Sequence, residues 1–197
     1  MPNTLTRSLI LGLILLLSSL HLFPQNPVKR PEITAGIGPG VNMASQETGM
    51  GIVYSLGWEK SLTDNQRLRI HPHILFGGFR PPFFVSDARD QHYRSSALNL
   101  AINYDLIKRS SGSIYLSGGG FVNYSRGLLG TGGGEDGYKN SEYFHSFYFG
   151  GSFSLGIRLT PVNSRLTYDI KAFNFMIGNN SFVTSYALIQ IGFRIAK

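Results

Sequence analysis

The ten residues LNLAINYDLI, from Leu98 to Ile107, alternate apolar and polar side chains. In an extended strand successive side chains point to opposite faces, so one face carries Leu, Ile and Tyr and the other Asn, Ala and Asp. A soluble sandwich turns such an apolar face toward its core, whereas a membrane barrel turns it toward lipid and its polar face toward the lumen. The stretch therefore predicts a two-faced strand, and the rest of the chain must decide what each face contacts.

The composition indicates one ordered domain. The 197 residues are 42% hydrophobic and 15% charged, with 24 Gly and no Cys. These values argue against a disordered, collagen-like or disulfide-rich protein. The net charge of +7 is spread along the chain rather than gathered in a basic stripe, so nucleic acid is not an expected partner.

The N-terminus predicts an export signal. Arg7 precedes the apolar run LILGLILLLSSL, which ends at Leu20 and is too short to span a membrane comfortably. We expect cleavage near Gln25, so that residues 1–25 form a signal peptide and residues 26–197 the mature domain. A retained N-terminal anchor is the alternative.

The alternation of the opening stretch recurs in eight segments. They are residues 32–41, 51–60, 67–79, 95–107, 113–126, 143–159, 165–176 and 182–196. Most are longer than the usual five or six residues of globular strands and match the nine to eleven or more that a tilted strand needs to cross a bilayer. The sequence therefore predicts an all-β fold, an eight-stranded antiparallel up-and-down transmembrane β-barrel.

The connections between these segments alternate in length. Short turns, SLTDNQ, KRSSGS and TPVNS, alternate with modest or long connections, of which RPPFFVSDARDQHYR and GLLGTGGGEDGYKNSE are the longest. Outer-membrane barrels have short turns in the periplasm and longer loops outside. An even number of strands then places both termini at the periplasmic end.

Six aromatic side chains share the outward parity and fall near strand ends. Trp58, Tyr104 and Tyr168 lie near the short turns, and Phe76, Tyr124 and Tyr143 near the long loops. Two such groups are typical of aromatic girdles at the membrane interfaces. The alternative is that aromatic residues simply suit strands.

Together, these strands, connections and parities resemble the small eight-stranded outer-membrane β-barrel proteins, the OmpX-like or porin-family barrel domains, over about residues 32–197. The resemblance implies an outer-membrane location, with membrane lipids and the barrel-assembly machinery as partners, and implies no functional residues. The last strand, YALIQIGFRIAK, has Phe193 on its outward face but ends in Lys197, where the family carries an aromatic residue. A soluble lipocalin-like barrel or sandwich is the alternative fold.

Charged residues of inward parity gather toward the short-turn half. They are Glu59, Arg67, Arg69, Asp105, Arg158, Asp169, Lys171 and Arg194. Buried charges are costly unless they are paired, and eight strands leave just enough room for side chains, so we expect a paired, hydrogen-bonded plug. A narrow pore for ions or small solutes, lined by the same residues, is the alternative.

Three other features yield weaker expectations. His71 and His73 alternate on the inward face without further ligands at a recognisable spacing, so we expect no metal and no cofactor. His145, near Glu142, suggests an outer-membrane lipid-modifying enzyme as an alternative function, but no catalytic motif accompanies it. Pro72 lacks the N–H that a central strand donates, so we expect a bulge there.

A non-enzymatic structural or surface-contact role is therefore the expected function. In the first long loop Phe83, Phe84 and Val85 stand beside charged residues, a composition typical of contact sites for a surface protein partner. The alternative is that these three side chains pack over the barrel mouth.

Overall fold

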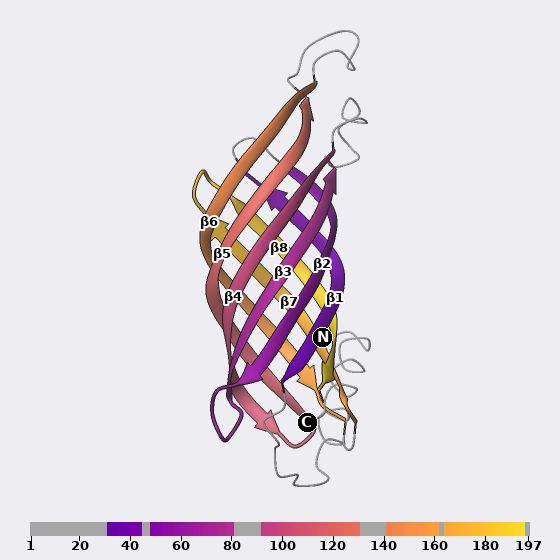
Figure 1. Cartoon of the computed structure of the whole chain (residues 1–197), viewed down its shortest axis with the longest axis vertical. Helices are drawn as coiled ribbons and strands as arrows, with labels where there is room; N and C mark the ends of the chain where they lie inside the picture. Colours follow the sequence, from indigo (N-terminus) through magenta and orange to yellow (C-terminus); the bar gives the residue numbers. More distant parts are fainter. Residues whose placement is uncertain (1–30, 45–47, 81–91, 131–140, 162–163, 196–197) are drawn as a thin grey trace, which may run out of the picture.

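The computed structural model describes residues 31–44, 48–80, 92–130, 141–161 and 164–195. Eight antiparallel strands form one closed barrel, in which each strand pairs with its neighbours in the chain and β8 pairs with β1 (Figure 1). The strands are β1 (Glu32–Met43), β2 (Thr48–Ser61), β3 (Leu68–Arg80), β4 (His92–Arg109), β5 (Gly112–Gly130), β6 (Ser141–Leu159), β7 (Leu166–Gly178) and β8 (Val183–Arg194). The predicted eight-stranded up-and-down barrel is confirmed. The predicted signal peptide lies outside the described residues.

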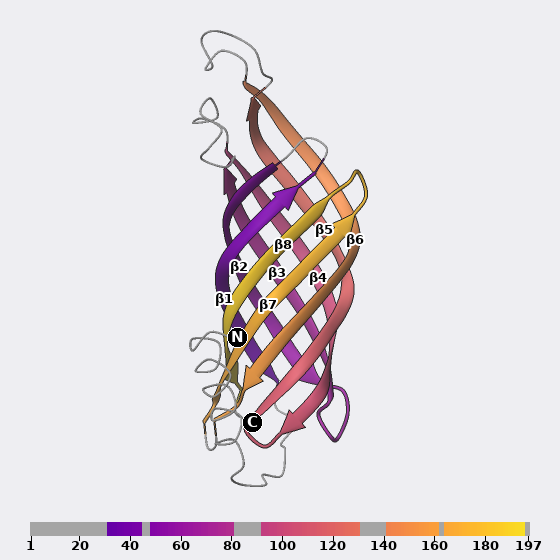
Figure 2. The ribbon, with the colours of Figure 1, turned by 180° about the vertical axis from the view of Figure 1, so that it is seen from behind.

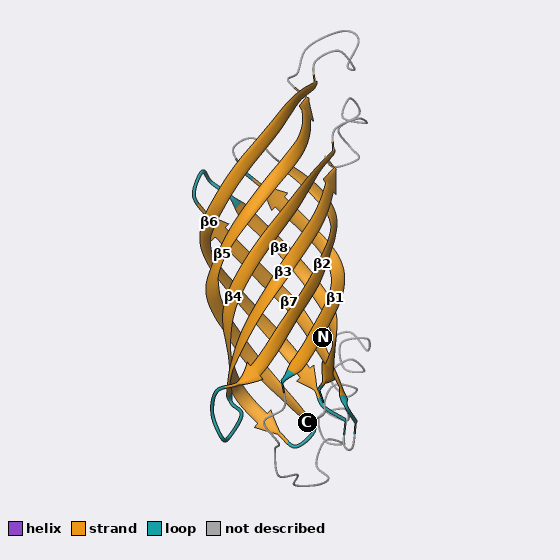
Figure 3. Cartoon of the chain, viewed as in Figure 1, coloured by secondary structure: helices purple, strands orange, loops and turns teal. Residues whose placement is uncertain are grey.

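The connections divide between the two ends of the barrel. β1 begins and β8 ends at the same end as the β2–β3 and β4–β5 turns (Figures 1 and 3). At the other end, which we call the long-loop end after the connections predicted from the sequence, β3 and β5 end and β4 and β6 begin. From behind, β8 lies beside β1 and closes the cylinder (Figure 2). No helix within the described ranges is long and apolar enough to cross a membrane.

The opening stretch shows which face points outward. Leu98, Leu100 and Ile102 of β4 are 55%, 54% and 48% exposed, whereas Asn99 and Asn103 between them are 2% and 0% exposed. The apolar face is thus on the outside of the barrel and the polar face in the lumen. A lipocalin-like barrel would have the opposite arrangement, so that alternative is wrong.

Pro72 does not cause the predicted bulge. On the β4 side Pro72 pairs with Leu100, and the ladder is continuous. On the β2 side the ladder is interrupted between two pairs, Gly57 with His73 and Lys60 with Ile70. Both strands advance by the same number of residues across the gap, so the register is unchanged. The missing N–H of proline therefore interrupts the ladder locally without inserting a residue, and the bulge prediction is wrong.

Register shifts occur elsewhere. One lies in the β4–β5 ladder at Asp105, and another lies in β7 between Lys171 and Asn174. In β7 the two residues between them, Ala172 and Phe173, are both exposed. Across this stretch β7 advances by three residues while β8 advances by two, so β7 contains one extra residue. The extra residue shifts the alternation of faces, and Lys171 and Asn174 therefore both point into the lumen although they are three positions apart.

Candidate functional site: a lumen filled in two layers

Arg158 of β6 is the centre of a buried ion-pair network. Its Nε and Nη2 donate to the two carboxylate oxygens of Asp169 on β7, at 2.9 and 2.7 Å. The same guanidinium donates to both oxygens of Glu59 on β2, with Nη2 2.9 Å from Oε2. Two carboxylates therefore share one guanidinium in the bidentate geometry that gives strong charge-assisted hydrogen bonds.

Arg69 of β3 extends the network across the barrel. Its Nε lies 3.0 Å from Oε1 of Glu59, and its Nη1 donates to Oδ2 of Asp105 at 2.8 Å. Asn103 Nδ2 donates to Oε2 of Glu59 at 2.7 Å. The ring of Tyr115, from β5, lies 5.4 and 5.7 Å from the Arg69 and Arg158 guanidinium carbons, within cation–π range. Opposite charges thus alternate from Asp105 through to Asp169.

Lys171 balances the charge of this network. It is 3% exposed, and its Nζ lies 3.5 Å from Nδ1 of His71. The His71 ring stacks on His73, with centroids 4.5 Å apart, and its Nε2 lies 3.0 Å from the hydroxyl of Thr34. The histidines are thus neighbours of the network. The described residues contain no group of three or more His, Cys, Asp or Glu side chains that could hold a metal.

The six buried charged residues of this network and its surroundings form what we call the charged layer. They are Glu59, Asp105, Asp169, Arg69, Arg158 and Lys171. Three carboxylates face three cations, and each of the six is at most 6% exposed. Such a buried group is tolerated only when its charges are paired and hydrogen-bonded.

Two of the predicted charges lie outside this layer. Arg67 is exposed in the turn before β3, because the strand begins only at Leu68, and its placement in the lumen network is therefore wrong. Arg194 lies at the end of β8, where its Nε is 3.9 Å from Oε2 of Glu32. Glu32 also accepts a hydrogen bond from Thr167. Arg194 thus belongs to a separate pair at the rim.

Sequence reasoning missed several polar members of the lumen. Glu32, Asn103 and Tyr115 are all at most 6% exposed. Asn103 stands on the polar face of the opening stretch, so its parity could have identified it. Tyr115 could not be found this way, because an aromatic residue in a strand is more often taken as part of the apolar face.

A second, apolar layer fills the lumen toward the long-loop end. It consists of Val53, Leu75, Phe79, Tyr93, Ala97, Phe121, Phe144, Tyr148, Met176, Phe182, Tyr186 and Leu188. Tyr148 and Phe182 stack with centroids 4.5 Å apart, and Phe79 stacks on Tyr93 at 5.3 Å. The sequence analysis did not predict this layer, because it considered only the charged and histidine side chains of the inward face.

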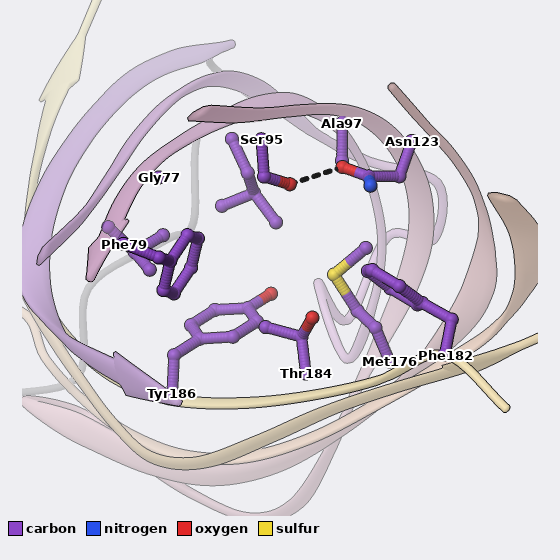
Figure 4. Close-up of a pocket in the computed structure, with 11 residues that line it drawn as sticks. Gly77, Phe79, Ser95, Ala97, Asn123, Met176, Phe182, Thr184 and Tyr186 are labelled. Atoms are coloured by element: carbon purple, nitrogen blue, oxygen red, sulfur yellow. Dashed lines mark hydrogen bonds between the residues drawn. The ribbon is translucent and has the colours of Figure 1, made fainter. Parts of the chain in front are cut away.

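A small cavity remains inside the apolar layer. Phe79, Met176, Phe182 and Tyr186 surround it, and Ser95 donates to Asn123 at 2.5 Å on its wall (Figure 4). Its volume of about 20 Å³ holds about one water molecule. A cavity of this size cannot hold a solute.

The outside of the barrel carries the predicted girdle residues. Trp58, Tyr104, Tyr168, Phe76, Tyr124 and Tyr143 are all exposed and face away from the lumen. Phe76 and Tyr124 flank Ser96 of β4 in one cross-strand row. The loop residues Phe83, Phe84 and Val85 lie outside the described part of the chain.

Comparison with solved structures finds the same fold in outer-membrane proteins. Neisserial surface protein A superposes with a TM-score of 0.61 at 12% identity, over 84% of this chain and 97% of that chain. Ail, the attachment invasion locus protein of Yersinia pestis, superposes with a TM-score of 0.52 at 10% identity, over 85% of this chain and 100% of that chain. The structure of Ail in complex with the heparin analogue sucrose octasulfate superposes with a TM-score of 0.53 at 8% identity, over 85% of this chain and 100% of that chain.

No protein-family model and no curated protein sequence matches this chain. At identities this low the superpositions concern the fold alone. The resemblance to the small eight-stranded outer-membrane β-barrels is thus confirmed at the level of the fold.

Proposed function

We propose that this chain is a bacterial outer-membrane β-barrel with a closed lumen, which has a structural or surface-contact role and no catalytic step. One observation carries the proposal, the apolar belt on the outside of the barrel. Every strand contributes to it, with Ile33, Ile37, Ile52, Leu56, Ile74, Leu98, Leu100, Ile102, Val122, Phe147, Phe149, Phe153, Ile170, Phe173, Ile189 and Ile191. A belt of this extent would promote aggregation in water, whereas the bilayer interior solvates it.

The proposed orientation follows from the connections. The short-turn end, where β1 begins and β8 ends, faces the periplasm, and the long β3–β4 and β5–β6 loops face outward. The surface-contact role is assigned to those loops, with Phe83, Phe84 and Val85 as the first candidates. Membrane lipids and the barrel-assembly machinery are the remaining proposed partners.

The two layers favour a closed barrel over the narrow pore. A selective pore keeps its charged side chains hydrated along a continuous path. Here all six charges of the charged layer are buried, five of them are joined in one ion-paired network, and the apolar layer lies above them. A pore through this lumen would have to displace both layers.

The enzyme alternative receives less support. His145 is exposed on the outside of β6, and its cross-strand neighbour on β5 is Arg126 rather than a carboxylate or a hydroxyl. General-base catalysis needs an orienting group and a nucleophile within hydrogen-bond reach of the histidine. The described cross-strand neighbour supplies neither.

Membrane fractionation and gel mobility test the barrel proposal. The mature protein should fractionate with outer membranes and migrate faster on detergent gels before boiling than after it. In planar bilayers it should show no steady conductance. A soluble protein without this heat-dependent mobility would refute the membrane location, and stable charge-selective conductance steps would refute the closed lumen.

Cysteine labelling tests the orientation, because the chain has no cysteine of its own. Leu62→Cys places a thiol in the β2–β3 turn, and Val85→Cys places one in the first long loop. A membrane-impermeant maleimide added to intact cells should label Val85→Cys and should label Leu62→Cys only after the outer membrane is broken. The reverse pattern would refute the orientation.

A further inference from the structure

Four basic side chains gather on the outside of the barrel near the long-loop end. Arg80 of β3, Arg94 of β4, Arg126 of β5 and His145 of β6 are all exposed, and we call them the basic patch. Arg126 lies directly opposite both Arg94 and His145 in the strand register. Arg80 stands two residues beyond Gly78, which is opposite Arg94. Their strands are consecutive members of one wall of the barrel (Figure 1).

No member of the basic patch forms an ion pair with another described residue. The ion pairs among the described residues of the barrel lie in the lumen or near the short turns, and none of them includes a member of the basic patch. Directly opposed side chains in a sheet have Cβ atoms about 4.5–5.5 Å apart, and like charges at that distance destabilise the pair. Among the described residues the charges of the charged layer are balanced and those of the patch are not, an arrangement suited to binding an anion.

The height of the patch matches a membrane interface. Tyr104, in the predicted girdle near the short turns, and Arg94 are ten positions apart on the same face of β4. At about 3.3 Å per residue and a tilt of about 40°, ten residues rise by roughly 25 Å along the membrane normal, which is the height of the apolar band of such barrels. Arg94 therefore lies where the belt ends and the headgroups begin.

The surroundings of the patch suit a lipid. Tyr124 and Phe147 stand two residues below Arg126 and His145 on the same outward faces, and both are exposed. The Cβ position of Gly78, opposite Arg94, has open space within 4 Å. A headgroup can therefore approach the guanidinium groups while its chains lie along the aromatic and aliphatic side chains below.

The patch is restricted to one side of the barrel. At the same end of β1, β2 and β7 the outward positions are occupied by Met43, Met50 and Ile177, which are 51%, 41% and 62% exposed. A uniform ring of cations would serve general attraction to an anionic surface. A single cluster on β3–β6 indicates a localised site.

We propose that the basic patch binds the phosphate group of a phosphorylated saccharide lipid in the outer leaflet. Arginine presents a planar fork of donors that matches phosphate oxygens, and the opposed Arg94 and Arg126 place two such forks at one point. The inference rests on the proposed function, since it requires the long-loop end to face outward.

Native mass spectrometry of the purified barrel in detergent tests this site, with bis-phosphorylated lipid A and chemically dephosphorylated lipid A as probes. The wild type should retain the phosphorylated form at least tenfold more tightly. Arg94→Gln and Arg126→Gln should each weaken this binding about fivefold, the effect expected for one basic residue at a membrane surface. Lys60→Gln is the matched control, because Lys60 is exposed on the outside of β2 at the opposite end and should leave binding unchanged.

The variants also have a stability readout that lipid binding does not share. Because Arg94 and Arg126 repel each other, either substitution should leave the lipid-free barrel as heat-resistant as the parent or more so. Equal binding of both lipid forms, unchanged binding by both variants, or full competition by millimolar inorganic phosphate or by a soluble sulfated polysaccharide would overturn the site. A protein that forms no heat-modifiable barrel would instead overturn the proposed function itself.

Discussion

Removing Asp169 tests the charged layer most directly. In the native lumen this carboxylate accepts two hydrogen bonds from Arg158, at 2.9 and 2.7 Å, and is 1% exposed. The change Asp169→Ala leaves Arg158 with Glu59 as its remaining acidic partner in the layer. Three cations then face two carboxylates, and the lumen carries an uncompensated buried positive charge.

Two independent estimates of the effect agree. Breaking a buried ion pair by removing one partner costs about 3–5 kcal/mol, because the other charge stays buried. Hydrogen bonds to charged groups contribute about 1.5–3 kcal/mol each, so the loss of two corresponds to about 3–6 kcal/mol. We therefore expect Asp169→Ala to lower the free energy of unfolding by about 3–5 kcal/mol.

Urea unfolding from phospholipid vesicles measures this change. The single tryptophan, Trp58, is exposed on the outside of the barrel, so its fluorescence reports transfer from lipid to water. Glu142→Ala is the control, because Glu142 is an exposed carboxylate on β6 and its loss should change stability by less than about 0.5 kcal/mol. In the double variant Asp169→Ala with Arg158→Met, the buried charge is removed and the loss should fall well short of the sum of the single losses.

Conductance completes the test. The apolar layer still fills the lumen above the altered site, so Asp169→Ala should remain closed in planar bilayers. A variant as stable as its parent that also conducts with a shifted ion preference would show that these charges are hydrated, and the reasoning for a paired plug would then be refuted.

Three further predictions concern the outer face and the packing of the lumen. Ile102→Arg in the middle of the belt should destabilise the membrane-inserted barrel by about 2–4 kcal/mol, whereas Leu62→Arg in the exposed β2–β3 turn should be tolerated; equal tolerance in refolding into vesicles would mean that the belt does not contact lipid. Gly38→Ala should destabilise by about 1–3 kcal/mol, because its Cβ would overlap the backbone of β8, while Gly118→Ala, which meets open space, should be neutral in the same urea titration. Tyr148→Ala should lower the unfolding free energy by about 3–5 kcal/mol, by analogy with other large aromatic truncations, yet leave the bilayer conductance at zero because the charged layer remains; steady current through this variant would contradict the two-layer plug.

The sequence alone predicted the barrel and the faces of its strands. Period-two alternation requires only local geometry, so the outward placement of Leu98, Leu100 and Ile102 could be predicted from their spacing once the loop asymmetry favoured a membrane barrel. Parity also selected all six members of the charged layer. It failed for Arg67, because parity says nothing about the residue at which a strand begins.

The tertiary structure decided how the lumen is filled. Which acid pairs with which base depends on the stagger of eight strands around the barrel, and the register shift in β7 alone changes which side chains share a level with Arg158. The apolar layer arises in the same way, because Phe79 of β3, Tyr148 of β6 and Phe182, which directly precedes β8, meet only when the sheet closes. Alternation along one strand is a local property, whereas contact across a barrel depends on the register of all its strands, and for that reason the faces could be predicted from the sequence and the plug could not.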